Sequence, residues 1–315
     1  MRKYDRNAVF NIVLKCFLFL AVFAGSFFLI RFLTGVSACI AAAVSLIPAL
    51  SAVLVFSLLL RYTRFYYGYY NFTSGFLFGN KKGNVYCPCC DKHFDQFKDE
   101  RFYADEKHFD PASFSVSRQD VICDCCRSSP RHRIIACWAE KNTGLLKGSE
   151  ILYFAPELSM MLWFKRHGIR VVTADLFDRR ADKKLDITSL DLPDESEDIV
   201  FCNHVLEHVS DYSAALSELH RILRKGGKLI ISFPVDSNLD EVREDKNASA
   251  EERIKLFGQF DHLRIFGKDS KKILEKAGFE VGTIDISDMP DEIVPVAGPS
   301  NYDTNMIFLC SKKPG

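Results

Sequence analysis

Residues 198–234, "DIVFCNHVLEHVSDYSAALSELHRILRKGGKLIISFP", hold the clearest structural pattern in the chain. The apolar runs "DIVFCNHV" and "KLIISFPV" are typical of buried strands. Between them, "DYSAALSELHRILRKGG" has apolar residues at helical spacing, with Asp211 placed to cap the helix and a Gly-Gly pair at its end. A strand, a helix and a second strand in this order predict two parallel strands joined by a right-handed crossover.

The same alternation of strands and helices continues on both sides of this segment. Upstream, "EILYF" predicts a strand, "ELSMMLWFKRHG" a helix closed by Gly168, and "IRVVTAD" a second strand that ends at Asp175. Downstream, "SKKILEKAGFEVGTIDIS" predicts a helix followed by a strand, and "NMIFLCSKK" predicts the last strand. We therefore expect an α/β fold, a doubly wound sheet with helices on both faces. Such sheets bind ligands at the carboxyl ends of their strands, near the topological switch point.

Residues 186–234 also carry three motifs in a fixed order. They are the acidic segment "DITSLDLP", a strand that leads to "VLEH", and the helix motif "LSELHRILRKGG". In this order they resemble class I S-adenosylmethionine-dependent methyltransferases of the type 11 group. The resemblance covers about residues 85–312, because similar bacterial enzymes place a cysteine-rich ribbon and an "ERHR"-like helix, here "PRHR", before the catalytic domain. It implies a Rossmann-like methyltransferase domain over residues 136–315.

The resemblance also assigns the cofactor site. It places the turn after the first strand beside the methionine part of S-adenosylmethionine, and it places Asp175 against the ribose hydroxyls, where two acceptor oxygens suit two neighbouring donors. The alternative for Asp175 is a surface aspartate that caps the next turn. The implied cofactor-binding residues are Phe154, Ala155, Glu157, Asp175, Asp186, Ile187 and Asn203, of which Asp186 and Ile187 lie beside the adenine.

The turn "APE" at 155–157 departs from the family pattern, which has glycines there. Pro156 removes one backbone N–H donor, and Glu157 brings a carboxylate to a place where a pyrophosphate needs N–H groups. S-adenosylmethionine carries a cationic sulfonium and ammonium and no phosphate, so the turn disfavours NAD more than the methyl donor. The missing glycines also leave open a non-catalytic scaffold that has lost its cofactor.

Three histidines are candidates for a catalytic base, because imidazole exchanges protons near neutral pH. His204 follows the strand "DIVFCN" and faces the transferred methyl by resemblance; His208 follows four residues later. His262 lies in "FDHLRIFG", between the fifth and sixth predicted strands, a region that lines the acceptor pocket in similar enzymes. The alternatives are that Glu207 and His208 only satisfy backbone groups at the strand-to-helix turn and that His262 is a loop residue without a chemical role.

Two cysteine clusters, "CPCC" at 87–90 and "CDCC" at 123–126, each contain a C-x-x-C pair. Two such pairs supply four thiolates to a tetrahedral zinc ion with no open position, which predicts a structural site in a zinc-ribbon-like module at residues 85–135. Alternatives are unligated reduced cysteines, or replacement of a ligand by a neighbouring cysteine or histidine. The predicted ligands are Cys87, Cys90, Cys123 and Cys126, and the competing residues are Cys89, Cys125, His93 and His108.

The first 65 residues contain two long apolar runs, Val9 to Ile30 and Val36 to Leu60. Each exceeds the ~20 residues that cross a bilayer, so they predict a transmembrane helical hairpin at 1–65 followed by a juxtamembrane linker at 66–84. A secretory signal peptide is the alternative for the first run. Arginine and lysine precede the first run and follow the second, which predicts that both ends, and the catalytic domain, face the cytoplasm.

The chain has 41 basic and 41 acidic residues, so no global field attracts nucleic acid, and no nucleic-acid partner is expected. The sequence therefore predicts a methyltransferase tethered to the cytoplasmic face of a membrane. Its acceptor would be a small molecule or a lipid-linked compound, and the location suggests a lipid, a quinone or a lipid-linked glycan.

Overall fold

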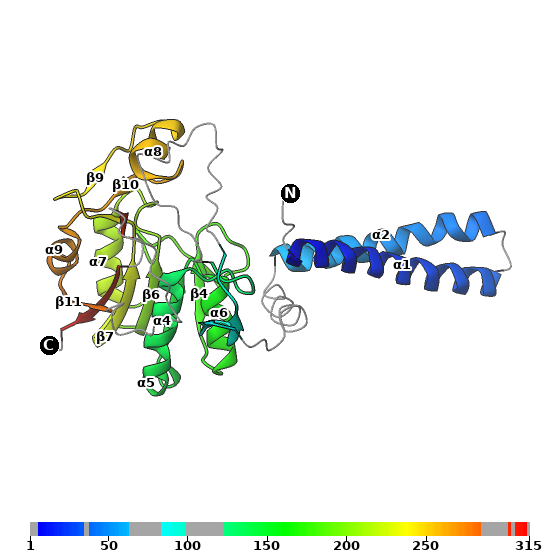
Figure 1. Cartoon of the computed structure of the whole chain (residues 1–315), viewed down its shortest axis with the longest axis horizontal. Coiled ribbons are helices and arrows are strands. Elements are labelled where there is room, and N and C mark those ends of the chain that lie inside the picture. Colours follow the sequence, from blue (N-terminus) through cyan, green and yellow to red (C-terminus); the bar gives the residue numbers. More distant parts are fainter. Residues whose placement is uncertain are drawn as a thin grey trace. The chain divides into compact units, whose positions relative to one another are not determined.

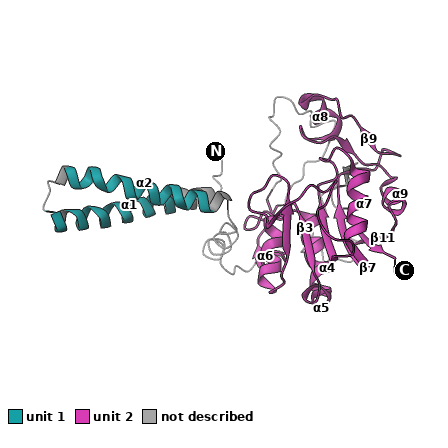
Figure 2. Cartoon of the chain, turned by 180° about the vertical axis from the view of Figure 1, so that it is seen from behind, with its two compact units in different colours: residues 1–79 teal, residues 80–315 magenta. Residues whose placement is uncertain are grey.

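The computed structural model describes residues 6–34, 38–62, 83–98, 122–284, 302–303 and 306–313. The chain forms two compact units, residues 1–79 and 80–315, which Figure 2 draws in different colours. Most of the linker predicted at 66–84, and the alternative ligand His108, lie outside the described residues. The other domain boundaries stay predictions.

The first unit contains two helices, α1 (Arg6–Thr34) and α2 (Ala38–Tyr62), which lie side by side (Figure 1). Both contain a stretch that is long and apolar enough to cross a membrane, Leu14–Thr34 and Ile40–Leu59. The predicted helical hairpin is therefore confirmed as a pair of long apolar helices.

The contact between these helices uses small side chains of α2. Ala41, Ser45 and Ala49 are fully buried and recur every four residues, so they lie on one face of the helix. Large apolar side chains such as Phe28 and Ile47 are exposed instead, at 70% and 68%. Small residues between helices and large apolar residues outside are the arrangement found in membrane helix pairs.

The second unit is built on a seven-stranded sheet in the order β11-β13-β7-β6-β3-β4-β5. The strands are β3 (Ile151–Phe154), β4 (Val172–Asp175), β5 (Lys183–Lys184), β6 (Glu197–Asn203), β7 (Leu223–Ser232), β11 (Phe279–Ile284) and β13 (Ile307–Lys312). β13 is antiparallel to both of its neighbours, and the remaining pairs are parallel. The chain leaves β3 toward β4 and β5 and returns to β6 on the other side. The topological switch point therefore lies between β3 and β6.

Helices cover both faces of this sheet (Figure 1). On one face, Phe164 of α6 (Leu158–Arg166) packs on Tyr153 and Phe201, with ring centroids 6.2 and 5.3 Å apart. Trp138 of α4 (Pro130–Lys141) also contacts Phe201, at 6.4 Å. Alternate strand residues, such as Leu152, join the core under α7 (Tyr212–Ile222) and α9 (Ser270–Lys276) on the opposite face. The predicted doubly wound sheet is confirmed.

Shorter elements complete the second unit. β1 and β2 form an antiparallel hairpin, β9 pairs with β10, and β8 pairs with β12. These elements and the two remaining helices are β1 (Val85–Cys87), β2 (Lys92–Phe94), α5 (Thr143–Lys147), β8 (Val235–Asp236), β9 (Arg243–Glu244), α8 (Ala250–Phe257), β10 (Arg264–Ile265) and β12 (Tyr302–Asp303).

The sequence predicts that the Gly-Gly pair ends α7, and this prediction is wrong. The helix ends at Ile222, and both glycines lie within β7, at a shift of its register with β6. Gly226 has a φ of +77°, and a Cβ at Gly227 would lie 2.8 Å from the carbonyl oxygen of Arg224. The glycines therefore allow the strand to begin directly after the helix with an irregular first turn. Asp211, in contrast, caps α7 as predicted, accepting from the Ala214 N–H.

Candidate active site

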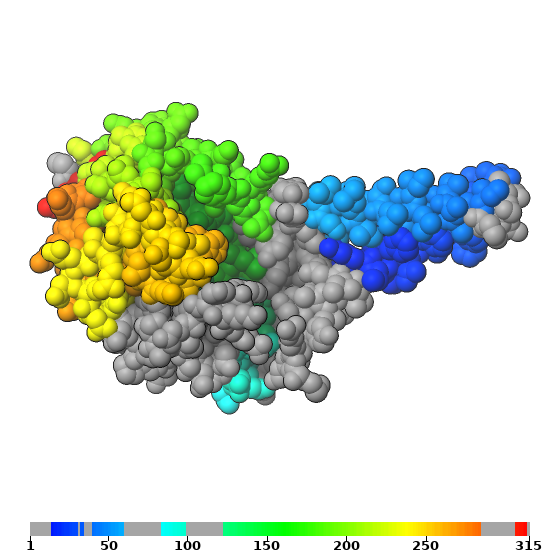
Figure 3. Space-filling model, turned by 90° about the horizontal axis from the view of Figure 1, so that it is seen from above, coloured from blue at the N-terminus to red at the C-terminus, as the bar shows by residue number. Residues whose placement is uncertain are grey.

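A cavity of about 520 Å³ opens at the carboxyl ends of β3, β4 and β6, beside the topological switch point. Seen from above, the green residues that follow β4 and the yellow-orange residues near 260 border a recess in the surface (Figure 3). Seven predicted residues line the cavity, and these are Phe154, Ala155, Asp175, Asp186, Ile187, His204 and His208. The structure thus brings together residues that lie up to 54 positions apart in the sequence.

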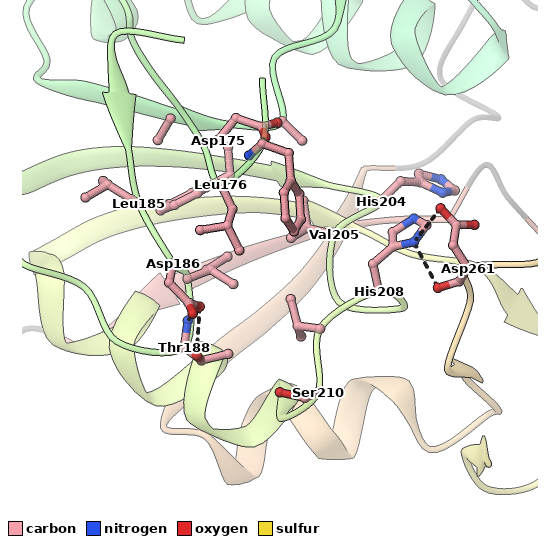
Figure 4. Close-up of a pocket in the computed structure, with 16 residues that line it drawn as sticks. Asp175, Leu176, Leu185, Asp186, Thr188, His204, Val205, His208, Ser210 and Asp261 are labelled. Atoms are coloured by element: carbon pink, nitrogen blue, oxygen red, sulfur yellow. Dashed lines mark hydrogen bonds and ion pairs between the residues drawn. The ribbon is translucent and has the colours of Figure 1, made fainter. Parts of the chain in front are cut away.

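Asp175 ends β4 and lines the cavity (Figure 4). Its Oδ1 accepts hydrogen bonds from the backbone N–H groups of Phe177 and Asp178, at 2.7 and 2.8 Å. The turn-capping role that the sequence left as an alternative is therefore present. It occupies one carboxylate oxygen, and it fixes the orientation of a carboxylate on the cavity wall.

Asp186 lies on the same wall, two residues before Thr188 (Figure 4). Its Oδ1 accepts from the Thr188 backbone N–H at 2.9 Å and from the Thr188 hydroxyl at 2.7 Å. These hydrogen bonds lower the pKa of Asp186, so its carboxylate stays ionised at neutral pH. Ile187 between them is buried and adds an apolar surface to the wall.

Ala155 begins the turn after β3 and has a φ of +48°. This left-handed conformation favours glycine, because it brings a Cβ close to the following carbonyl oxygen. The Ala155 N–H donates to the carbonyl of Ala174 at 2.9 Å, which holds the turn against the end of β4. The turn therefore keeps a backbone conformation typical of glycine although it contains no glycine.

We expect Ala155→Gly to raise the free energy of unfolding by about 1 kcal/mol, because it removes the penalty of a left-handed alanine and adds only the smaller entropy of glycine in the unfolded chain. Ala174→Gly is the matched control, since Ala174 is buried in a strand without a positive φ. It should be destabilising by about 1 kcal/mol or more. Urea unfolding would measure both, and an equal loss of stability in the two variants would contradict the strained turn.

Glu157 turns away from the cavity, unlike the other predicted residues of this turn. Its carboxylate forms ion pairs with Arg131 and, at 2.6 Å, with Nε2 of His132, both on α4. Nδ1 of His132 lies 2.9 Å from the Ser129 backbone N–H and accepts from it, so the Nε2 hydrogen faces Glu157. In the structure Glu157 joins the start of α6 to α4, and its predicted contact with the cofactor stays a prediction.

The electrostatics of this contact favour an ionised Glu157. Burial raises the pKa of its carboxyl, but the charge of Arg131 and the contact with the His132 ring outweigh burial and hold the pKa far below its ordinary value. The Tyr153 hydroxyl also donates to Glu157, at 3.2 Å. The Glu157 carboxylate therefore contacts protein groups, whereas the carboxylates of Asp175 and Asp186 line the cavity.

Asn203 lies at the end of β6 and is almost fully buried. Its Oδ1 accepts from the Ser232 hydroxyl at 2.9 Å, across the β6–β7 pair. It is not among the residues that line the cavity. Asn203 supports the strand ends beneath the cavity, and its predicted contact with the cofactor stays a prediction.

His204 follows Asn203, has a φ of +52° and is among the residues that line the cavity (Figure 4). Its Nδ1 lies 2.9 Å from Oε1 of Glu207, whose side chain is fully buried. Burial and the nearby charge of Arg131 lower the pKa of His204, so the ring is neutral at neutral pH. An Nδ1–H directed at Glu207 leaves the lone pair on Nε2, which is buried and has no hydrogen-bond partner among the described residues.

His208 and His262 lie at the same end of the cavity as His204. Nδ1 of His208 is 3.4 Å from both the carbonyl oxygen and Oδ2 of Asp261 (Figure 4). His262 is buried, and its Nδ1 lies 3.0 Å from the Phe257 carbonyl oxygen. The rings of the two histidines meet edge to face with centroids 4.8 Å apart. His208 lines the cavity, whereas His262 lies behind it.

Comparison with known proteins agrees with this geometry. A protein-family profile described as "Methyltransferase domain" matches residues 159–231, from α6 to β7. The second unit therefore contains a methyltransferase domain. The curated relatives include the malonyl-[acyl-carrier protein] O-methyltransferase of Yersinia pestis, 44% identical over 57 residues, which are 18% of this chain and 21% of the relative. A probable S-adenosylmethionine-dependent methyltransferase of Mycolicibacterium smegmatis is 30% identical over 95 residues, 30% of this chain and 33% of the relative.

The chain thus spans between a fifth and a third of the length of these relatives. Among solved structures, the 1,6-didemethyltoxoflavin-N1-methyltransferase of Burkholderia thailandensis is 17% identical with a TM-score of 0.38. The match covers 58% of this chain and 79% of that chain.

The methyltransferase domain contains site residues that the sequence did not reveal. Arg131 holds Glu157, and Arg264, although fully buried, donates to the carbonyl oxygens of Leu206 and Val209 at 2.5 and 2.6 Å. The signal for Arg264 was a single arginine inside the apolar stretch "HLRIF". No local pattern identified the carbonyl groups that it contacts.

The four predicted metal ligands come together beside the methyltransferase domain. The Sγ atoms of Cys87, Cys90, Cys123 and Cys126 all lie within 4.8 Å of one another. The Cys87–Cys126 and Cys90–Cys123 pairs are 3.6 and 3.7 Å apart, close to the edge of about 3.8 Å in a tetrahedron with metal–sulfur bonds of about 2.3 Å. The four cysteines therefore fit a tetrahedral metal ion.

The competing ligands lie outside this group. Cys89 and Cys125 are buried nearby but are not members of the four-thiol cluster, and His93 is exposed on β2, with its ring 4.9 Å from that of Tyr86. The turn that carries Cys90 also contacts the methyltransferase domain. Arg166 of α6 donates to the carbonyl oxygens of Pro88 and Cys89, at 2.5 and 2.9 Å.

Proposed function

We propose that the chain is an S-adenosylmethionine-dependent methyltransferase. The observation that carries the proposal is the pair of carboxylates, Asp175 and Asp186, on the wall of one cavity at the switch point. Its volume of about 520 Å³ lies within the range of small-molecule sites, about 300–1,000 Å³. Two carboxylates suit a cationic cofactor and disfavour a phosphate-bearing one. Asp175 would accept from the ribose hydroxyls, and Asp186 with Ile187 would contact the adenine.

Bound S-adenosylmethionine supplies an activated methyl group, so the chain's main task is to hold the acceptor in line with it. A hydroxyl acceptor must also lose a proton, and His204 is the best placed base. Its neutral ring lines the cavity, and Glu207 orients it through Nδ1 and stabilises the imidazolium that forms. His208 and His262 are further candidates at the same end.

The tether is the second part of the proposal. The apolar helices α1 and α2, with basic residues at both ends of the hairpin, support two membrane spans with the methyltransferase domain in the cytoplasm. A soluble or signal-sequence role for α1 is the alternative. At the membrane surface the enzyme would meet a lipid, a quinone or a lipid-linked glycan as acceptor.

The four-cysteine cluster supports a structural zinc site. Thiolate ligands favour zinc, and four of them leave no position for substrate. The metal would fix two turns of the chain. The turn that carries Cys90 contacts α6, and the turn that carries Cys126 precedes α4. The metal would thereby help to position Arg131 and His132 against Glu157.

The competing function is a membrane-anchored zinc-binding scaffold that binds no cofactor. In the sequence, the absence of glycine from the turn at Ala155 favours this scaffold. In the structure, Ala155 keeps the left-handed conformation that glycine adopts most easily. This retained turn geometry supports the enzyme rather than the scaffold.

Calorimetric titration of the full chain in detergent with S-adenosylmethionine tests the proposal. We expect binding by the wild type and at least tenfold weaker binding by Asp175→Asn, because the amide oxygen can still cap the turn while the charge and one acceptor are lost. Asp191→Asn is the control on an exposed aspartate. Absence of S-adenosylmethionine binding by the wild type would overturn the proposed methyltransferase activity. Binding by Asp175→Asn as tight as that of the wild type would show that Asp175 only caps the turn.

A further inference from the structure

A second cluster of metal-ligand side chains lies apart from the four cysteines. Glu207 and His208 follow β6, and His262 lies in the loop before β10. One ligand atom from each of the three residues lies within 4.8 Å of the other two. Two imidazoles and one carboxylate, brought together from segments 54 residues apart, form the donor set of many transition-metal sites.

Both histidines are oriented as metal ligands are. Nδ1 of His262 lies 3.0 Å from the Phe257 carbonyl oxygen, so Nδ1 carries the hydrogen and Nε2 keeps its lone pair. Nδ1 of His208 faces the carbonyl and carboxylate oxygens of Asp261, each at 3.4 Å, which favours the same tautomer. Metal-bound histidines characteristically donate their second ring N–H to such oxygens.

Glu207 needs a positively charged partner. Its side chain is fully buried, and neither carboxylate oxygen has a hydrogen-bond donor among the described residues beyond the ion-pair contact of Oε1 with His204. A buried carboxylate with a single contact, here with the His204 ring, is unfavourable, because it has lost its hydration. A cation bound between Glu207 and the two histidines would compensate for that loss.

We propose that Glu207, His208 and His262 bind a divalent first-row transition-metal ion. The nitrogen ligands favour zinc, iron, cobalt or nickel over magnesium and calcium, which prefer oxygen ligands. Three protein ligands leave coordination positions open, and His208 lines the cavity. If the proposed methyl transfer is correct, those positions would take an oxygen atom of the acceptor and favour its deprotonation.

Cobalt(II) tests the site in the full-length chain in detergent. The protein is first loaded with one equivalent of zinc, which the four thiolates take, and is then titrated with cobalt. We expect one further equivalent to bind with visible absorption of nitrogen and oxygen coordination and without thiolate-to-cobalt charge transfer. His208→Ala should weaken this binding at least tenfold, and so should His262→Ala.

His220→Ala is the matched control, because His220 packs on Phe279 of β11, with ring centroids 5.1 Å apart, and belongs to neither cluster. It should bind cobalt as the wild type does. His208 is partly exposed, so its replacement keeps the test valid if His262→Ala does not fold. Absence of cobalt binding by the zinc-loaded wild type, or unchanged binding by His208→Ala, would overturn the site. Cobalt is measured without S-adenosylmethionine, so this result is independent of cofactor binding.

Discussion

Replacing Cys90 and Cys123 together by serine is expected to release one equivalent of metal per chain and to unfold the zinc-ribbon-like module. The two residues supply one ligand from each C-x-x-C pair, and their Sγ atoms lie 3.7 Å apart. The two remaining thiolates cannot complete a tetrahedral site. Structural zinc contributes an apparent binding free energy of about 10–16 kcal/mol near neutral pH, and in small modules this is folding free energy.

The loss should extend to the methyltransferase domain, because α4 begins at Pro130, four residues after Cys126. Ser128 lies 3.1 Å from the Cys87 sulfur, and its carbonyl accepts from Arg133 at 2.9 Å. When these turns unfold, Arg131 should no longer be held against Glu157.

Metal analysis and hydrogen exchange measure the result. We expect amide protection at residues 83–98 and 122–135 to fall to the level of an unfolded segment. Cys137→Ser, on α4 but outside the cluster, should keep the metal and the protection. A metal content of the double variant equal to that of the wild type would show that other residues are the ligands.

The sequence predicted the parts of this site that depend on local periodicity. Asp175 and His204 could be placed because Asp175 ends one strand and His204 follows another, and parallel strands bring their carboxyl ends to one edge of the sheet. Spacing alone also predicted the four cysteines, because a C-x-x-C turn determines which sulfurs can share a metal. In both cases a few adjacent residues contain the whole signal.

The direction of Glu157 could not be predicted in this way. Its position in the turn suggested a contact with the cofactor, whereas its partners Arg131 and His132 lie about 25 residues upstream. Which of several nearby carboxylates faces a cavity depends on how two helices pack. A pattern within one turn contains no information on that packing.

The cluster of Glu207, His208 and His262 shows the same limit. The sequence offered the two histidines as separate base candidates and Glu207 as a residue that satisfies backbone groups. Their proximity depends on the loop before β10 returning to the end of β6, where the Leu263 N–H donates to the Glu207 carbonyl at 2.8 Å. Contacts of this range come from tertiary structure.

Arg264→Met, on β10, should strongly destabilise the loop that carries Glu207 and His208, lowering the free energy of unfolding by about 3–5 kcal/mol. The guanidinium is fully buried and donates to the carbonyls of Leu206, Val209 and Ser210, at 2.5, 2.6 and 3.4 Å. It also pairs with Glu244 through Nε at 2.8 Å. Methionine fills part of the space but leaves three carbonyl oxygens and a carboxylate without their donor.

Arg264→Lys should recover only part of this stability, because an ammonium cannot reach the carboxylate and the carbonyls with the fixed fork of a guanidinium. The matched control is Lys268→Met, which removes an exposed pair with Asp240 and should change stability by less than about 1 kcal/mol. Urea unfolding of the three variants measures the difference. Since Arg264 holds the loop between β6 and α7, Arg264→Met should also weaken cobalt binding at the Glu207, His208 and His262 cluster, whereas Lys268→Met should not. Equal stability of Arg264→Met and Lys268→Met would mean that the loop is held by its apolar contacts alone.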